Sequence, residues 1–208
     1  SHITDEFKQM TFGNFDATHK PQPIQKMKEI AMTYTTKFRE IRDTRTNSIA
    51  LLGQPGIGKT HLLCAVANNF IQKWLVPVHY FPYVEGMEDL KASFNDTEVA
   101  LAVKMERLKN VDVLFIDDLF KPVSKTVKEE RISVPRATEW QIERMFEIIN
   151  YRYLNNKPLL ISSELDFIQM LAIDEALASR IFEMCAAYTV TIEKDVTLNH
   201  RMRKVFGH

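Results

Sequence analysis

The residues best placed to do chemistry form one run, Gly53-Gln54-Pro55-Gly56-Ile57-Gly58-Lys59-Thr60. It fits G-x-x-x-x-G-K-[ST] and stands between a short apolar segment and an expected helix. Backbone N–H groups of such a loop surround phosphate oxygens, and the helix N-terminus adds partial positive charge. We expect an exposed Lys59 to reach the β- and γ-phosphates and the Thr60 hydroxyl to ligate Mg²⁺. A chance glycine turn is the alternative.

Two adjacent carboxylates, Asp117 and Asp118, follow the apolar run Val113–Ile116. A buried strand that ends in acids can carry one of them to a metal beside a phosphate-binding loop. We expect Asp117 to hold Mg²⁺ through water and Asp118 to orient or deprotonate the attacking water. The alternative is that both residues only cap the next turn. The 58 positions from Lys59 to Asp117 leave room for a helix, a strand and a helical pair.

Apolar periodicity along the chain predicts the elements that must position these residues. The expected strands are residues 48–52, 77–81, 111–116, 159–163 and 188–192. The expected helices are residues 24–41, 59–73, 85–109 with a break near 95–96, 140–153 and 174–185. Strands that alternate with helices indicate an α/β fold, here a five-stranded parallel sheet with helices on both faces.

Composition limits the class of protein. The 208 residues are 45% apolar and 26% charged, with 27 basic and 27 acidic side chains. This balance excludes a strongly basic nucleic-acid coat but not a local basic patch. The two cysteines, Cys64 and Cys185, allow neither a zinc cluster nor a disulfide framework. No transmembrane span or signal peptide fits, so we expect a cytoplasmic protein without a membrane partner.

The motifs together resemble the AAA+ ATPase domain of the DnaC/DnaI-type bacterial or phage helicase loaders, which is similar also to the IstB transposition ATPases. The matching segments are residues 58–63, 79–82, 113–119, 146–153 and 177–181. The resemblance implies a P-loop NTPase with little or no C-terminal lid domain. Residues 1–23 are then an N-terminal segment, in which Ser1-His2 reads as a tag scar, and residues 24–208 are the ATPase domain. A separate helicase-binding domain is expected outside this chain.

The resemblance also assigns roles to individual residues. It implies that Arg180 is an arginine finger for a neighbouring subunit, although Arg180 could instead pair with Asp174 or Glu183. Arg201 or Arg203 would be a sensor-2-like arginine. The implied nucleotide-binding residues are Gln54, Pro55, Gly56, Ile57, Gly58, Lys59, Thr60, His61 and Arg201. Phe12 and Phe15 would lie near the adenine, or they simply pack where the first long helix begins.

Two departures from the family pattern stand out. After the fourth strand the chain reads Ser162-Ser163-Glu164, so a glutamate stands where the sensor-1 asparagine is expected. Either Ser163 takes the polar role, or hydrolysis is slow because a carboxylate adds negative charge near the γ-phosphate. A shift of one residue in the strand or helix would instead move Glu164 out of the site. Beyond Asp118, a polar stretch runs to Pro135, and the basic residues in it or directly after it are Lys121, Lys125, Lys128, Arg131 and Arg136. This stretch is either a solvated loop or a contact to a DNA backbone or a partner.

The resemblance therefore implies an ATP-dependent loader of the replicative DNA helicase. It would bind ATP or ADP with Mg²⁺, hydrolyse ATP weakly as an isolated domain, self-associate and contact single-stranded DNA. Two alternatives remain: an IstB-like transposition helper, and a nucleotide-sensing adaptor that barely hydrolyses ATP. A small-molecule kinase is disfavoured because no arginine-rich lid segment follows the fourth strand.

Overall fold

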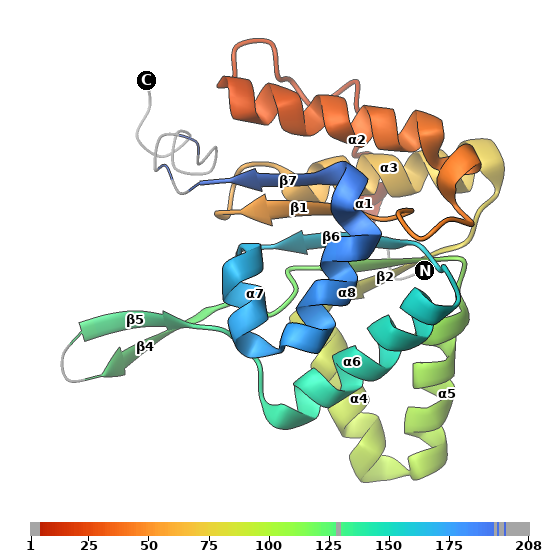
Figure 1. The fold of residues 1–208 in the computed structure, drawn as a ribbon, viewed down its shortest axis with the longest axis vertical. Coiled ribbons are helices and arrows are strands. Elements are labelled where there is room, and N and C mark those ends of the chain that lie inside the picture. The colour runs from red at the N-terminus through yellow and green to blue at the C-terminus, as the bar shows by residue number, and fades with distance from the viewer. Residues whose placement is uncertain (1–4, 128–129, 194, 196–197, 199–208) are drawn as a thin grey trace.

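The computed structural model describes residues 5–127, 130–193, 195 and 198 (Figure 1). Its centre is a parallel sheet with the strand order β2-β3-β6-β1-β7. The strands are β1 (Ile49–Gly53), β2 (Val78–Pro82), β3 (Val113–Asp117), β6 (Leu159–Ser163) and β7 (Thr189–Ile192). The expected five-stranded parallel sheet is confirmed, and each strand begins within two residues of its expected position.

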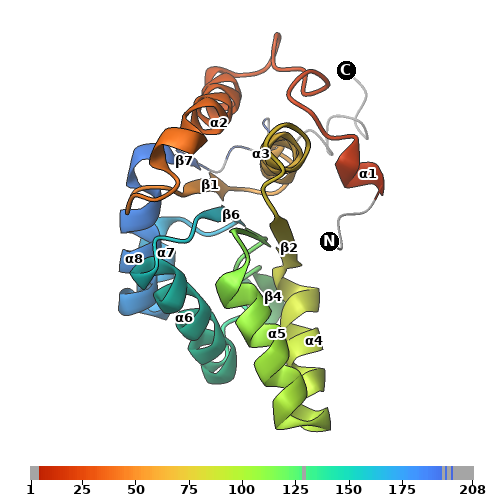
Figure 2. The same cartoon turned by 90° about the vertical axis from the view of Figure 1, so that its right-hand side faces the viewer.

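Helices cover both faces of this sheet, because its central strands are apolar on both sides. In β1, Ile49 and Leu51 pack into one core, while Ala50 and Leu52 pack into the other. The first core is covered by α1 (Asp5–Lys8), α2 (Gln22–Ile41) and α3 (Lys59–Trp74). The second is covered by α4 (Tyr83–Asp96), α5 (Glu98–Asn110), α6 (Glu139–Leu154), α7 (Phe167–Ile173) and α8 (Glu175–Cys185). Figure 2 shows the two layers on opposite sides of the strands.

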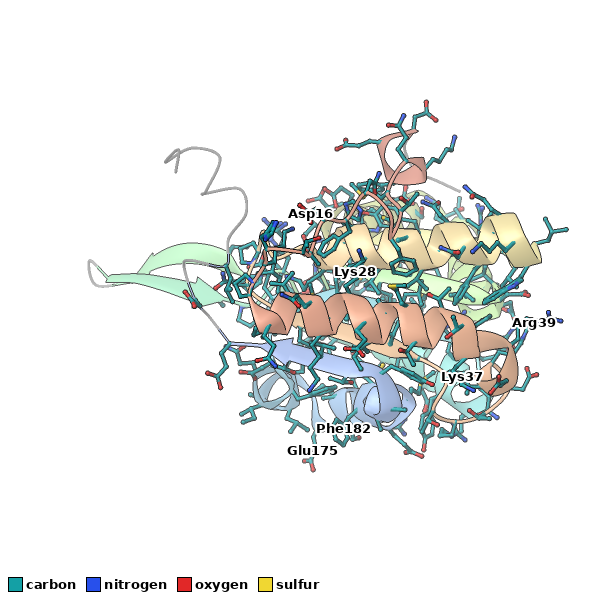
Figure 3. All side chains as sticks on the ribbon, turned by 90° about the horizontal axis from the view of Figure 1, so that it is seen from above. Asp16, Lys28, Lys37, Arg39, Glu175 and Phe182 are labelled. Carbon is teal, nitrogen blue, oxygen red and sulfur yellow. The ribbon has the colours of Figure 1, made fainter. Side chains whose placement is uncertain are left out.

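The outer side of α2 faces solvent. Viewed from above, this helix carries Lys37 and Arg39 on its surface, and both side chains are exposed (Figure 3). Its opposite side holds Met27, Ala31 and Tyr34, which are fully buried. The helix is therefore amphipathic, as its apolar spacing predicts.

Several elements were not expected from the sequence, chief among them a hairpin and a helix. The polar stretch after Asp118 forms an antiparallel hairpin of β4 (Val123–Val127) and β5 (Glu130–Val134), which replaces the expected loop. It extends away from the body of the molecule (Figure 1). A further helix, α7, lies between β6 and α8. It begins with a capping box in which Asp166 and Gln169 exchange hydrogen bonds.

A fully buried arginine joins the layers at the end of the sheet opposite the phosphate loop. Arg152 donates hydrogen bonds to five carbonyl oxygens that lie at the end of α5, before β3 and before β6: those of Leu108, Lys109, Val111, Asp112 and Pro158. These bonds compensate for the burial of its charge. A short 3₁₀ turn, η1 (Ala186–Tyr188), leads from α8 into β7. Within the described residues no helix is both long and apolar enough to cross a membrane.

Candidate nucleotide-binding site

The glycines of the phosphate-loop motif hold conformations that other residues adopt at a cost. Gly53, Gly56 and Gly58 have φ values of 137°, 80° and 98° between the end of β1 and the start of α3. At Gly58 there is a second reason for glycine, since a Cβ atom would lie 2.4 Å from the Phe15 ring. The loop and the N-terminal segment therefore fit together only because residue 58 lacks a side chain.

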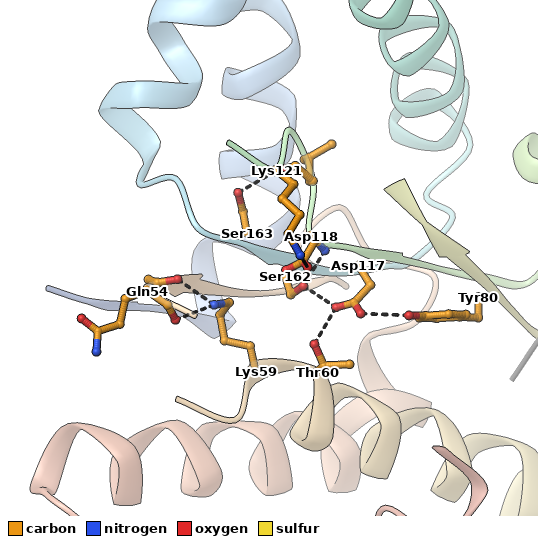
Figure 4. A network of polar contacts seen from close by, with 11 residues as sticks. Gln54, Lys59, Thr60, Tyr80, Asp117, Asp118, Lys121, Ser162 and Ser163 are labelled. Carbon is orange, nitrogen blue, oxygen red and sulfur yellow. Dashed lines mark hydrogen bonds and ion pairs between the residues drawn. The ribbon is translucent and has the colours of Figure 1, made fainter. Parts of the chain in front are cut away.

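Lys59 is buried, and the expectation that it is exposed was wrong. Its exposed fraction is 5%, and its amine donates hydrogen bonds of 2.6 Å to the Gly53 carbonyl and 2.8 Å to the Gln54 carbonyl (Figure 4). Burial lowers the pKa of the amine to about 8. The amine thus folds back on the loop that would hold phosphates, where an entering anion can replace the two carbonyls as its partner.

Asp117 is the centre of the polar network in Figure 4. One carboxylate oxygen accepts hydrogen bonds from the hydroxyls of Thr60, at 2.9 Å, and Ser162, at 2.5 Å. The other accepts a bond of 2.9 Å from the Tyr80 hydroxyl. Burial raises the pKa of Asp117, while the Ser162 and Thr60 hydrogen bonds act in the opposite direction. Thr60 and Asp117 together offer hard oxygen donors of the kind that Mg²⁺ prefers.

Asp118 lies beside Asp117 but has different partners. Its φ is 57°, and its backbone N–H donates a bond of 2.8 Å to the Ser162 hydroxyl. Its carboxylate forms an ion pair of 2.6 Å with Lys121. Ser162 therefore contacts both acids, and sequence reasoning missed it together with Tyr80 and Lys121. The register of β3 with β6, which sets Ile116 opposite Ile161, is the signal that could have placed Ser162 there.

The sensor-1 region divides into one buried residue and one that lines the cavity. The Ser163 hydroxyl donates to the Leu119 carbonyl at 2.7 Å and accepts from the Leu165 N–H at 3.1 Å. Ser163 is fully buried, so the structure does not support the expectation that it takes the polar role beside phosphate. Glu164 instead lines the same cavity as Lys59 and Asp118.

One cavity of about 790 Å³ brings most of the expected site residues together, and this size suits a ligand such as a nucleotide. Its lining includes the residues Pro55, Gly56, Ile57, Gly58, Lys59, Thr60, His61, Asp117, Asp118, Lys121 and Glu164. The N-terminal segment forms a further part of its wall, through Asn14, Phe15, Asp16 and Lys20. The described residues contain no group of three or more His, Cys, Asp or Glu side chains that could hold a metal. A Mg²⁺ ion here would need phosphate oxygens as additional ligands.

His61 and Gln54 hold other chain segments. A ring nitrogen of His61 lies 3.0 Å from the Thr11 carbonyl and 3.0 Å from the Asn14 side-chain oxygen. The Gln54 side chain exchanges two hydrogen bonds with the backbone of Asp195. Both residues therefore tie segments from near the ends of the described chain to the phosphate loop. Phe15 is buried and lies edge-on to the His61 ring, which fits the packing alternative for this residue.

Arg180 is not part of this cavity. From α8 its guanidinium donates to the Asn150 side chain at 2.9 Å and to the Ala176 carbonyl at 2.7 Å, and it lies over the ring of Phe146. Among the described residues, neither Asp174 nor Glu183 forms an ion pair with it. Asp174 instead caps α8, and Glu183 accepts a bond from Tyr153. A residue that acts on a neighbouring subunit does not need to reach its own cavity. Arg201 and Arg203 lie outside the described residues.

Comparisons with known proteins agree with this architecture. The family model for the bacterial DnaA ATPase domain matches residues 10–187. In Bacillus subtilis (strain 168), the protein YqaM is 53% identical over 97% of this chain and 61% of its own length. The phage-like element PBSX protein XkdC of the same strain is 50% identical over 99% of this chain and 73% of its own length. The chain thus spans less than two thirds of YqaM.

Solved structures show the same fold at low sequence identity. A structure of DnaI has a TM-score of 0.70 at 20% identity and covers 96% of this chain and 95% of its own. The DnaC helicase loader has a TM-score of 0.69 at 21% identity over 91% and 99% of the two chains. The replication initiator DnaA bound to AMPPCP and single-stranded DNA has a TM-score of 0.69 at 21% identity over 99% and 57%. The chain has the AAA+ P-loop fold of these proteins, and it belongs to the family of bacterial DnaA ATPase domains.

Proposed function

We propose that this chain is an ATP-hydrolysing domain that loads the replicative DNA helicase onto single-stranded DNA. The observation that carries the ATPase part is the convergence of Lys59, Thr60, Asp117 and Asp118 on one cavity. Helicase loading is supported by the fold shared with the DnaC helicase loader. The DnaA structure with AMPPCP and single-stranded DNA supports both a nucleotide and a DNA strand as ligands.

In the proposed reaction, ATP lies with its phosphates against the loop from Gly53 to Thr60. The Lys59 amine exchanges its two carbonyl partners for phosphate oxygens, which carry more charge. Thr60 and Asp117 would hold Mg²⁺, whose charge offsets that of the phosphoryl oxygens. Asp118 orients a water whose oxygen bonds to Pγ. The bond from Pγ to the bridging oxygen breaks with its electron pair left on ADP, and Asp118 takes the proton of the water.

Self-association completes this proposal. Arg180 would approach the γ-phosphate held by a neighbouring copy, where a permanently charged guanidinium stabilises the developing charge. The hydrogen bond to Asn150 and the rings of Phe146 and Tyr153 would keep the guanidinium in a fixed orientation. A single copy would then hydrolyse ATP slowly.

A nucleotide-sensing adaptor is the second candidate function. It is favoured by Glu164, which lines the cavity and places a negative charge there. An adaptor and a loader differ in turnover, because only the loader needs repeated hydrolysis to release its cargo.

The test combines the full-length protein with a replicative helicase and circular single-stranded DNA, so that the helicase cannot thread from an end. We expect ATP to increase the helicase retained on the circle, and Lys59→Ala to abolish this increase. Retention that is the same with and without the wild-type protein contradicts loading. ATP-dependent capture of a transposase in place of the helicase would favour the transposition helper.

A further inference from the structure

Lys121 forms an ion pair with Asp118, the acid that orients water in the proposed reaction. Its amine lies 2.6 Å from a carboxylate oxygen of Asp118, and its backbone N–H donates a bond of 2.9 Å to the Asp118 carbonyl. This charge-assisted bond engages one of the two carboxylate oxygens, Oδ2, and holds the carboxylate in one orientation. In this conformation Asp118 can offer a water only its remaining acceptor positions.

Lys121 and Lys59 come to the cavity from different elements. Figure 4 shows the Lys59 amine, from the start of α3, bonded to loop carbonyls, and Lys121, from the loop after β3, paired with Asp118. Both side chains line the same cavity, together with Asp118 and Glu164. An anion bound between them would meet two cations at once. An amine with three donors on a flexible four-carbon stem can change partners inside such a cavity.

Hydrogen bonds and packing fix the backbone around Lys121, so a change of its ion-pair partner needs a movement of the side chain alone. The Leu119 N–H donates to the Ser162 carbonyl at 2.9 Å, and the Leu119 carbonyl accepts from Ser163 at 2.7 Å. Phe120 is fully buried against the Tyr83 ring. Asp118 and Phe120 have φ values of 57° and 54°, which non-glycine residues keep only where their surroundings enforce them. The loop thus presents Lys121 from a rigid base.

We propose that Lys121 distinguishes ATP from ADP within its own subunit. Without a γ-phosphate the Lys121 amine pairs with one oxygen of Asp118 and holds that carboxylate turned toward itself rather than toward an attacking water. When ATP is bound, the amine leaves the Asp118 oxygen and bonds to a γ-phosphate oxygen, and this movement frees Asp118. The inference rests on the proposed ATPase function. No covalent bond changes in this exchange, in which one ion pair replaces another.

The exchange has a consequence for affinity. The bond from Lys121 to the γ-phosphate exists only with ATP, whereas the bonds to the α- and β-phosphates exist with both nucleotides. Removing the amine should therefore weaken ATP binding and spare ADP binding. Removing the charge of Asp118 should strengthen ATP binding relative to ADP binding. The Lys121 amine then has no carboxylate partner that competes with the γ-phosphate.

The experiment measures the affinities of ADP and the non-hydrolysable ATP analogue AMPPCP, each with Mg²⁺, for the full-length protein by calorimetry. For Lys121→Met we expect AMPPCP to bind about tenfold more weakly, with ADP affinity within about twofold of the wild type. Lys121→Arg should keep most of the preference. Asp118→Asn should raise the ratio of AMPPCP to ADP affinity. The matched control is Lys104→Met, since Lys104 makes a 2.7 Å ion pair with Asp89 away from this cavity.

The outcomes separate this inference from the proposed function. If the folded wild type binds neither nucleotide, the proposed ATPase function fails and the role of Lys121 falls with it. If the wild type binds both, and Lys121→Met changes both affinities equally or not at all, only the role of Lys121 is overturned. If Lys121→Met does not fold, a ratio for Asp118→Asn at or below that of the wild type overturns it instead.

Discussion

The Thr60 hydroxyl donates a 2.9 Å hydrogen bond to the Asp117 carboxylate across 57 positions of sequence. This bond joins the first turn of α3 to the last residue of β3, the two places where the sequence predicts phosphate and metal chemistry. Both oxygens are hard donors, so they would suit a Mg²⁺ ion, with the Thr60 hydroxyl turning its hydrogen away from Asp117 to offer a lone pair.

Asp117 and Asp118 should respond differently to the loss of charge. Asp117→Asn should weaken Mg²⁺-dependent ATP binding by at least about tenfold, because a neutral amide is a poorer ligand for the ion. Asp118→Asn should spare ADP binding and lower turnover. Calorimetry with and without Mg²⁺, together with phosphate release, measures both effects. Equal and mild effects of the two variants on every quantity would mean that the acids only cap β3.

Gly58 should be far less tolerant of a side chain than Gly13. At Gly58 a Cβ atom would lie 2.4 Å from the Phe15 ring and the backbone has a φ of 98°, whereas at Gly13 it would lie 3.7 Å from the Thr11 hydroxyl. We expect Gly58→Ala to lower the free energy of unfolding by about 1–3 kcal/mol and to impair nucleotide binding. Gly13→Ala should change neither greatly. Urea unfolding of both variants measures this difference, and equal stability would contradict the fit of Phe15 over the loop.

The sequence predicts the sheet and the site motifs because their signals are local. The apolar run Val113–Ile116 is typical of a strand buried on both faces, and the glycine pattern from Gly53 to Gly58 is typical of a phosphate-binding turn. The hairpin after Asp118 lacks such a signal, since its strands are polar and no strongly turn-forming pair such as Asn-Gly marks the bend. Helix α7 is too short to show a clear apolar periodicity, although its capping box marks where it begins.

The details of the site depend on contacts between distant residues. Ser162 and Ser163 are neighbours, yet only the strand register decides that Ser162 faces Asp117 while Ser163 turns to Leu119. Lysine side chains are usually exposed, and Lys59 is buried because its amine folds back onto the carbonyls of Gly53 and Gln54. Neither the opposite orientations of Ser162 and Ser163 nor the burial of Lys59 can be predicted from a local sequence pattern.

Glu164 should slow hydrolysis through its charge. Its carboxylate lines the cavity beside Lys59 and Asp118, where a γ-phosphate would add further negative charge. We expect Glu164→Asn to raise turnover several-fold, since an amide can donate a hydrogen bond and carries no charge. Steady-state phosphate release measures the change, with Glu175→Asn on exposed α8 as the control. An unchanged or lower rate for Glu164→Asn would show that the carboxylate does not limit hydrolysis.

Loss of Arg180 should lower the ATPase rate only under conditions in which copies of the chain associate. Arg180→Ala should leave ATP affinity of the dilute protein nearly unchanged and remove the rise in ATPase rate with protein concentration or DNA. The expected loss is on the order of a thousandfold, as for arginine fingers generally. The exposed helix residue Arg107 offers a control, since Arg107→Ala should leave the rise intact.

Mixing two inactive variants tests whether Arg180 acts between subunits. Arg180→Ala protein keeps a complete phosphate loop, and Lys59→Ala protein keeps the arginine. Mixed assemblies should therefore regain part of the ATPase rate. Two folded variants that associate but regain no activity at any ratio would contradict a finger acting across subunits, and would favour the adaptor.

The central claim is that the cavity around Lys59 holds a nucleotide, and calorimetric titration of ADP with Mg²⁺ tests it most directly. Among the described residues, the hydrogen-bond partners of the Lys59 amine are two loop carbonyls, so Lys59→Ala should keep the fold, as judged by circular dichroism and thermal unfolding. We expect the wild type to bind ADP and the folded Lys59→Ala protein to show no measurable binding. Equal ADP affinity of the two folded proteins would contradict the central claim.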